Sequence, residues 1–391
     1  MIPMSYSVRS LARRPLTSMM TIGGLSLVVF VFAAMLMLSR GVHDAMAKNG
    51  SPDNGMILRD GATSEAVSSV SRDQLRLLQA SPEIAADAQG NPLIAGEVMV
   101  ISNLPRIDAA PNTPGANVGV RGVAPASLQI RNSIKVVKGR LPRPGTLEVM
   151  VGASVEGRYP GSRVDETLSF ARRQWPVVGV FTAGGSAFES EIWGDEQSVA
   201  DAYNRQAFTD VLFRLKGKDA LSALASRMAA DPSLSTLKAW REDEFFDVQS
   251  ETLRSFIVGL GAFVTVIFAI AAGFGATVTM YSQVSNRLRE IGTLRAIGYR
   301  RFTVLRVFLR EAILLSVLSG VIGTAAASLL SLASFSALNT QSFTQITFHF
   351  HFNADVALSA LRFSIAMGLL GGFVPALSAA RQLIVNAVRA R

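Results

Sequence analysis

Few side chains in this sequence could perform acid-base or nucleophilic chemistry. A serine or cysteine triad needs a histidine base, and the chain of 391 residues contains 3 histidines and no cysteine. His43 lies beside a long apolar stretch, whereas His349 and His351 alternate with phenylalanines. On a strand this i, i+2 pair would face one way, but a metal site needs a third ligand. We therefore expect no metal site and favour an amphipathic strand that packs its phenylalanines.

The sequence also lacks a nucleotide-binding loop. The pattern Gly-x-x-x-x-Gly-Lys-[Ser/Thr], whose backbone cradles phosphates, does not occur, and Gly217-Lys218 lacks both the first glycine and the following hydroxyl. Acidic residues are scattered, without the paired spacing typical of acid-base catalysis. We expect the chain to have no catalytic residue, no bound cofactor and no enzymatic activity of its own.

The most patterned polar segment runs from Arg287 to Arg301. Apolar residues at helical spacing, followed by a glycine, predict a short amphipathic helix there: Ile291, Leu294, Ala296, Ile297 and Gly298. The arginines alone would indicate only how the chain is oriented in a membrane.

The composition indicates that the segment belongs to a membrane protein. Hydrophobic residues make up 49% of the chain, charged residues 17%, and the mean hydropathy is +0.32. The net charge of +9 is compatible with nucleic acid, an anionic membrane surface or arginines that fix topology. Without cysteine, any domain outside the cytoplasm has to be held together by core packing alone.

Four apolar stretches are long enough to cross a bilayer. The first contains about 22 residues, which as a helix extend roughly 33 Å and match a hydrocarbon core of about 30 Å. We predict transmembrane helices at residues 17–38, 256–280, 312–338 and 362–380. A cleaved signal peptide is the alternative for the first, because arginines precede it and Ala45-Met46-Ala47 resembles a cleavage site. Its apolar stretch is longer than a signal peptide usually has.

Small residues inside these stretches allow helices to approach closely in lipid. The predicted packing positions are Gly259, Gly273, Gly320, Gly323 and Gly371.

The arginines predict the orientation of the four helices. Arginines concentrate in residues 1–16, 281–311 and 381–391, whereas residues 339–361 contain no lysine or arginine. By the positive-inside rule both termini and the loop 281–311 are cytoplasmic. Residues 39–255 and 339–361 are then outside. Because topology accounts for the basic residues, we expect no nucleic-acid binding.

Residues 39–255 form a segment of roughly 215 residues that is typical of a water-soluble domain. We expect strands near residues 56–59, 93–102, 117–123, 146–151, 175–181 and 209–216, and helices at 71–80 and 219–230. Residues 241–254 have helical charge spacing and continue into the second span, which predicts a helical stalk. The expected fold is an α-helical membrane protein with four transmembrane helices and a mixed α/β extracytoplasmic domain inserted between helices 1 and 2.

The order of residues in and after the loop 281–311 is similar to a known family. Glu290-Ile291-Gly292, Leu294 to Gly298 and Phe308-Leu309-x-Glu311 resemble the coupling-helix region of the MacB/FtsX-type ABC transporter permeases. Arg9 to Leu25 is similar to the family's entry into the first span, and Val120 to Asp195 resembles its MacB-like periplasmic core domain.

The C-terminal segment fits the family only in part. Pro375-Ala376 and Ala379-Ala380-Arg381 are similar to the family's last span, but Ile384-Val385 stand where a proline is often found. This departure affects the tail's expected contact with a partner.

The resemblance implies a multi-pass protein of the bacterial inner membrane that works with other proteins. The implied partners are a cytoplasmic ABC ATPase that binds ATP and Mg²⁺, a second permease copy or paralogue, a periplasmic membrane-fusion adaptor and membrane lipids. Because no phosphate loop occurs in this sequence, we expect the ATPase to be a separate polypeptide.

The resemblance also implies roles in ATPase coupling for single residues. Glu290 and Arg295 would make polar contacts with the ATPase. Apolar residues of the short helix would fill its groove, and the glycines would allow close approach and end the helix: Ile291, Leu294, Ala296, Ile297, Gly292 and Gly298.

Two functions follow from the resemblance. The first is a permease subunit that exports or extrudes an amphiphilic or lipid-linked substrate by mechanotransmission, with the ATPase driving the outer domain. The alternative is a regulatory FtsX-like permease that activates an extracytoplasmic partner, such as a cell-wall hydrolase, without transport. The length of the outer domain favours the first, because hydrolase-activating relatives generally carry a smaller one.

Overall fold

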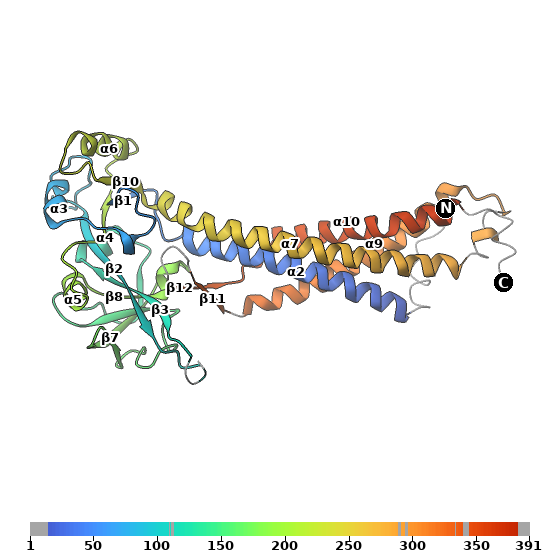
Figure 1. The fold of residues 1–391 in the computed structure, drawn as a ribbon, viewed down its shortest axis with the longest axis horizontal. Helices are drawn as coiled ribbons and strands as arrows, with labels where there is room; N and C mark the ends of the chain where they lie inside the picture. The colour runs from blue at the N-terminus through green and yellow to red at the C-terminus, as the bar shows by residue number, and fades with distance from the viewer. Residues whose placement is uncertain are drawn as a thin grey trace. The chain divides into compact units, whose positions relative to one another are not determined.

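The computed structural model describes residues 15–108, 110, 113–287, 291–293, 296–332, 334–338 and 344–381. The chain divides into two compact units (Figure 1). We call Met1–Arg40, Phe256–Ala333 and His349–Arg391 the membrane unit. We call Gly41–Ser255 with Ser334–Phe348 the inserted domain.

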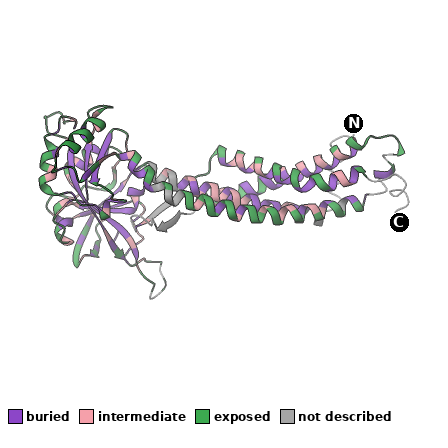
Figure 2. Cartoon of the chain, turned by 45° about the horizontal axis from the view of Figure 1, so that its top comes forward, coloured by how far each residue is buried: buried purple, intermediate pink, exposed green. Residues whose placement is uncertain are grey.

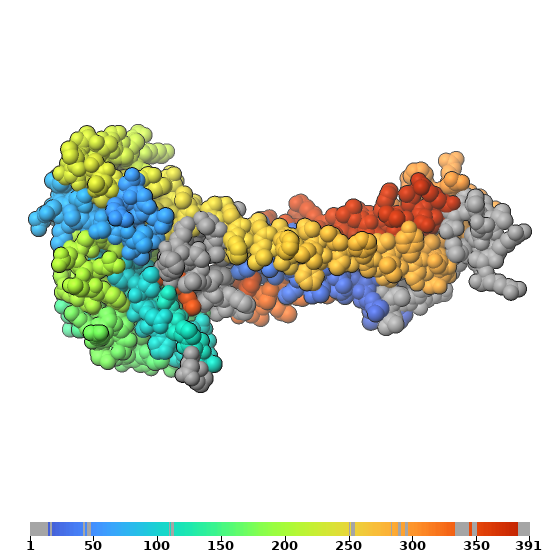
Figure 3. Space-filling view, viewed as in Figure 1, coloured from blue at the N-terminus to red at the C-terminus, as the bar shows by residue number. Residues whose placement is uncertain are grey.

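Long helices form most of the membrane unit, and two of them, α2 and α7, continue into the inserted domain. The helices are α2 Pro15–Ala47, α7 Glu242–Ser285, α9 Arg301–Ser328 and α10 Ala354–Arg381. Among the described residues, four spans are long and apolar enough to cross a membrane: Ser18–Gly41, Ser255–Ser282, Arg301–Leu332 and Ala354–Arg381. Helix α7 runs along the face of the membrane unit that Figure 3 shows. Its exposed apolar side chains include Phe263 and Phe274, as expected of a helix in contact with lipid.

The third helix begins earlier than the sequence predicted. Helix α9 starts at Arg301, whereas the prediction placed residues 301–311 in the loop and began the span at Ala312. Val304, Val307 and Phe308 recur at helical spacing and are buried. Packing of this apolar face therefore extends the helix through an arginine-bearing segment that a search for uncharged stretches excludes.

The connection between α9 and α10 also differs from the prediction. After the 3-10 turn η3, Leu329–Leu332, strand β11, Ser334–Leu338, pairs with β12, Gln345–His349. The predicted third span, 312–338, therefore ends too late, because the alternating residues of β11 form a strand. Strand β12 ends before His351, so the two histidines do not share a strand as predicted.

Helix α10 begins at Ala354, inside the predicted outer loop 339–361. The Asn353 side chain caps it, accepting a hydrogen bond from the Val356 backbone N–H at 3.0 Å. Residues 354–361 thus extend the fourth predicted span, 362–380, toward the N-terminus.

A ten-stranded sheet forms the centre of the inserted domain, in the order β10-β1-β9-β2-β3-β8-β5-β7-β4, with β6 paired to β7. The strands are β1 Asn54–Arg59, β2 Ile94–Leu104, β3 Ala116–Val123, β4 Lys135–Gly139, β5 Val149–Gly152, β6 Thr167–Phe170, β7 Arg173–Thr182, β8 Glu191–Asp195, β9 Asp210–Arg214 and β10 Leu237–Arg241. The six predicted strands correspond to β1, β2, β3, β5, β7 and β9. The short strands β4, β6, β8 and β10 were not predicted.

Short helices surround the sheet: α3 Arg72–Gln79, α4 Pro125–Ile130, α5 Glu196–Ala202 and α6 Ala220–Ala230, with the 3-10 turns η1 Glu65–Val67 and η2 Ala187–Ser190. Both bonds of a capping box at Ser71 and Gln74 are present at the start of α3. Helix α5 packs on β2 and β3, and α6 packs on β10.

Most strand residues of the inserted domain are buried (Figure 2). Neighbouring residues of a strand belong to two different cores, one on each face of the sheet. In β1, for example, Ile57 belongs to one core, whereas Met56 and Leu58 belong to the other. Phe245 and Phe246, in the second turn of α7, join the second core. Helix α7 is therefore packed into the inserted domain from its first turns and continues as one helix to Ser285.

Candidate functional site

The candidate coupling segment follows the end of α7. Arg287 Nη1 donates hydrogen bonds to both carboxylate oxygens of Glu311, in α9, at 3.0 and 3.1 Å. The Glu311 side chain is fully buried, the Arg287 side chain is 9% exposed, and its guanidinium lies 6.0 Å from the centre of the Phe308 ring. A buried, charge-assisted pair therefore connects the end of α7 to α9.

Ile291 does not have the position that the family resemblance implied. Its side chain is buried in a cluster with residues of α7, α9 and α10. Its backbone N–H donates to the Arg287 carbonyl at 2.9 Å, with the i to i−4 spacing of an α-helical hydrogen bond. A side chain packed inside its own chain cannot also fill a partner's groove, so the partner-groove role predicted for Ile291 does not fit its position. Gly292 beside it is likewise buried.

The end of this segment is at the surface. Ile297 is 72% exposed, Ala296 is exposed, and Gly298 has φ +102°, a conformation that favours glycine and fits a helix end. Phe302, at the start of α9, is 70% exposed. Apolar surface beside exposed arginines suits a protein partner. The predicted contacts Glu290, Leu294 and Arg295 lie outside the described residues.

The predicted packing glycines differ in how closely other helices approach them. A Cβ atom at Gly323 would lie 2.6 Å from a carbonyl oxygen of α2, and one at Gly320 would lie 3.1 Å from a Cβ of α10. One at Gly371 would lie 3.0 Å from a Cβ of α7. A Cβ at Gly273 would meet a methyl group of α10 at 3.9 Å, whereas none of the described residues comes within 4 Å of one at Gly259. The packing role of Gly259 stays a prediction.

The inserted domain contains a buried charge cluster that sequence reasoning missed. At its centre, Arg121 of β3 is fully buried. It donates hydrogen bonds to Glu65 at 2.7 Å, to Glu97 at 2.9 Å and to Glu191 at 2.9 Å. Charged residues inside apolar runs, such as Glu97 in Ile94 to Ile101, were the available signal. Along the sequence these acidic residues are only scattered.

The cluster continues through a second arginine. Arg131, which caps α4, donates to Glu97 at 2.6 Å and to Glu242, the first residue of α7, at 2.8 Å. The ring of Phe188 lies close to both guanidinium groups, at 5.2 Å from Arg121 and 4.8 Å from Arg131. The cluster thus extends from the middle of the sheet to the start of a membrane-spanning helix.

Carboxyl groups outnumber arginines in this cluster, which also includes Asp210 of β9. The pKa values of Glu97 and Asp210 are shifted in opposite directions. Burial would raise the pKa of Glu97, but Arg131 and Arg121 hold that pKa below its ordinary value. Burial, together with nearby Glu65 and Glu97, raises the pKa of Asp210 well above its ordinary value. Asp210 therefore holds a proton more readily than an exposed aspartate does.

The described residues include no group of three or more His, Cys, Asp or Glu that could hold a metal ion. Glu65, Glu97, Glu191 and Glu242 each accept a hydrogen bond from a guanidinium group, as in a structural network.

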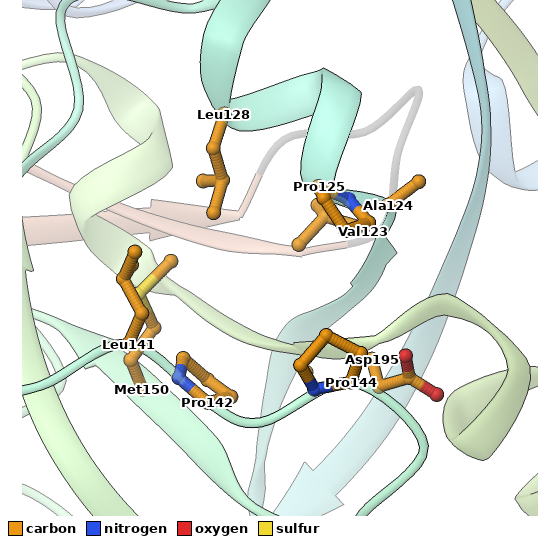
Figure 4. A pocket seen from close by; sticks show the side chains of 10 residues that line it. Val123, Ala124, Pro125, Leu128, Leu141, Pro142, Pro144, Met150 and Asp195 are labelled. Atoms are coloured by element: carbon orange, nitrogen blue, oxygen red, sulfur yellow. The ribbon is translucent and has the colours of Figure 1, made fainter.

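A small pocket of about 170 Å³ lies elsewhere in the inserted domain (Figure 4). Its lining is mainly apolar: Val123, Ala124, Pro125, Leu128, Leu141, Pro142, Pro144, Met150, Gly194 and Asp195. Asp195 uses its carboxylate to cap α5, accepting a hydrogen bond from the Ser198 N–H at 3.0 Å. The pocket therefore offers apolar contact but no convergent polar groups.

Two family profiles together cover most of the chain. Residues 18–231 match the MacB-like periplasmic core domain, and residues 262–384 match the FtsX-like permease C-terminal domain. The first match includes the buried charge cluster except Glu242, and the second includes the candidate coupling segment.

Curated relatives are similar over much of this chain. A macrolide export ATP-binding/permease protein MacB of Shewanella oneidensis is 25% identical over 370 residues, which are 83% of this chain and 54% of the relative. The protein of the same name from Neisseria meningitidis is 27% identical over 236 residues, 57% of this chain and 35% of the relative. The chain thus spans about half the length of the first relative. The periplasmic region of MacB from Actinobacillus actinomycetemcomitans is 11% identical with a TM-score of 0.37, over 55% of this chain and 97% of that one.

Proposed function

This chain belongs to the family of MacB/FtsX-type ABC transporter permeases, and we propose that it couples a separate cytoplasmic ATPase to the inserted domain to export or extrude an amphiphilic or lipid-linked substrate. One observation carries the proposal. Helix α7 is continuous from Glu242, which is buried in the inserted domain, to Ser285, just before the Arg287–Glu311 pair. A single helix that is packed at both ends can pass displacement from the coupling segment to the domain.

The proposed complex contains two permease chains and two ATPase subunits. The ATPase binds ATP and Mg²⁺, and this chain binds neither. A second copy or a paralogue completes the dimer, and a periplasmic membrane-fusion adaptor is the proposed outer partner. The conformational change requires an ATPase whose contacts with the coupling segment differ between its nucleotide states.

The proposed orientation places both termini and the coupling segment in the cytoplasm and the inserted domain outside. The chain has no native cysteine, so a single introduced cysteine is the only thiol in it that a maleimide can label. We expect Gln89→Cys, exposed in the inserted domain, to react with an impermeant maleimide in intact cells. Thr293→Cys should react only after the membrane is permeabilised. Labelling of Thr293→Cys in intact cells would show that the orientation is the reverse of the one proposed.

The exposed Ile297 provides the test of ATPase docking. Ile297→Glu places a carboxylate in a surface that would become buried against the ATPase. We expect about tenfold or greater loss of ATPase bound to the purified full chain, as for an interface hot spot. The matched control is Val137→Glu, because Val137 is also an exposed apolar residue, at 54%, but lies in β4. Equal ATPase binding by the two variants would contradict the docking assignment.

The wild-type complex from the same purification also tests the choice between export and regulation. Mass spectrometry should detect a membrane-fusion adaptor or a bound amphiphile with the wild-type complex. A cell-wall hydrolase in place of both would overturn the export proposal in favour of a regulatory permease.

A further inference from the structure

Glu242 is buried at the point where α7 begins. Its side chain is 1% exposed, and its carboxylate accepts three hydrogen bonds. The donors are Arg131 Nε at 2.8 Å, Asn54 Nδ2 at 2.7 Å and the backbone N–H of Ser51 at 3.1 Å. All of these residues belong to the inserted domain.

The chain that leaves α2 meets the first turn of α7 at the same carboxylate. Ser51 follows α2 closely in sequence, and Gly50 packs so tightly on the backbone of Asp243 that a Cβ atom there would overlap it. The Asn49 side chain accepts a hydrogen bond from the Phe188 N–H at 3.3 Å. Both chain segments that connect the inserted domain to α2 and α7 are therefore fixed at one place.

From Glu242 the contacts lead directly into the sheet. Arg131 bonds Glu242 and also Glu97 of β2, and Glu97 in turn bonds Arg121 of β3. Phe246 of α7 packs edge-on against Phe188, with ring centres 5.8 Å apart. Charge-assisted hydrogen bonds thus link the first turn of α7 to two central strands without a break.

Stability alone does not account for this arrangement, since well-packed apolar residues of similar volume often stabilise a core as well as buried ion pairs do. Charge-assisted hydrogen bonds are directional, however, and arginine donates them in a fixed planar geometry. Such a contact permits one orientation of α7 on the sheet, whereas apolar packing alone allows slippage.

We propose that Glu242 is a positioning residue. With Arg131, Asn54 and the Ser51 backbone it forms what we call the α7 joint, which holds the first turn of α7 at a fixed angle to β2 and β3 while α7 is displaced. The inference rests on the proposed function, because a rigid joint matters only if α7 transmits force to the domain.

Distances between two spin labels inside the inserted domain test the joint. We would label Val248→Cys in α7, 57% exposed, and Gln174→Cys in β7, also exposed, in the full chain in nanodiscs diluted with unlabelled chain. With the native joint we expect one narrow distance distribution, with or without ATP and vanadate on the co-purified ATPase. Glu242→Gln should broaden this distribution about twofold. The amide NH₂ group of glutamine would face one of the N–H donors that now bond the carboxylate.

A neighbouring ion pair supplies the control. Asp243, in the same turn of α7 as Glu242, accepts a hydrogen bond from Arg241 of β10 at 2.7 Å, but the side chains of this pair are 47% exposed for Arg241 and 23% for Asp243. Asp243→Asn should leave the distribution as narrow as the native one. Equal widths for Glu242→Gln and the native sequence would overturn the proposal. If Glu242→Gln does not accumulate, Asn54→Ala removes one donor and no charge. Intermediate broadening is then expected, and an unchanged width would equally overturn the proposal.

A second measurement separates the joint from the proposed function. Label at Gln174→Cys alone, in undiluted complex, reports the distance between the inserted domains of two chains. This distance should change on adding ATP and vanadate, and Glu242→Gln should reduce the change by about half or more while ATP hydrolysis continues. An unchanged distance in the native complex would contradict force transmission. The widths of the distance distributions measured without nucleotide would still show whether the α7 joint holds α7 in place. A full change with Glu242→Gln would overturn the joint as a positioning element.

Discussion

Replacing Arg121 with methionine is expected to unfold the inserted domain. Arg121 is fully buried, and its guanidinium is shared by Glu65, Glu97 and Glu191. Breaking one buried pair typically costs about 3–5 kcal/mol, and here several buried carboxylates lose a partner together. A typical domain is stable by only about 5–15 kcal/mol, so most of that margin would be lost. Hydrogen-deuterium exchange of the full chain should show β2, β3 and β8 unprotected.

Arg76→Met is the matched control for this prediction. Arg76 also pairs with a carboxylate, Asp73, but their side chains are 75% and 85% exposed. Exposed pairs contribute about 0–1 kcal/mol, so the strands should remain protected. Native protection in Arg121→Met would mean that the cluster does not hold the sheet together.

Glu311→Gln is expected to destabilise the end of the membrane unit that carries the coupling segment. The amide cannot supply the negative charge that the Arg287 guanidinium contacts at two oxygens, in a site where Glu311 is fully buried. The expected cost is about 3 kcal/mol, at the lower end for a broken buried pair. Ile291, packed beside the pair, should become accessible. Thermal unfolding in detergent and labelling of Ile291→Cys measure the two effects.

Two further variants test the cause of this loss. Arg306→Gln changes an exposed arginine of the same helix and should leave both measurements near native. The double variant Arg287→Met with Glu311→Leu replaces both charges by apolar side chains and should recover most of the lost stability. If the double variant were less stable than Glu311→Gln, the loss of stability in Glu311→Gln would not come from leaving the Arg287 charge unpaired in an apolar environment.

The membrane helices could be predicted because the signal is local. An apolar run of sufficient length indicates a span whatever the rest of the chain does, and four spans were found where runs had been identified. Their ends could not be predicted as well. Arg301 to Arg310 is helical because one face packs, and Ser334–Leu338 is a strand because it pairs with β12. Both depend on contacts that an uncharged run does not reveal.

Residue order in the coupling segment predicts a site, but it does not determine which of its side chains are buried. The pattern gave Ile291 and Ile297 the same role, yet the structure buries one and exposes the other. On a helix of 3.6 residues per turn, positions six apart differ in direction by about 120°, so the two residues do not share one narrow face. Which of them faces α9 and α10 and which faces a partner depends on the packing of the whole membrane unit.

The sequence by itself determined the fold class, the four spans and the family, because hydrophobic length and motif order are properties of continuous segments. Tertiary structure alone decided the buried charge cluster and the burial of Ile291. Glu97, Arg121 and Glu191 come from three separate strands, and only the pairing of β2 with β3 and of β3 with β8 places them on one face. The role proposed for Glu242 also depends on tertiary structure, because its hydrogen-bond donors Ser51, Asn54 and Arg131 are far from it in the sequence.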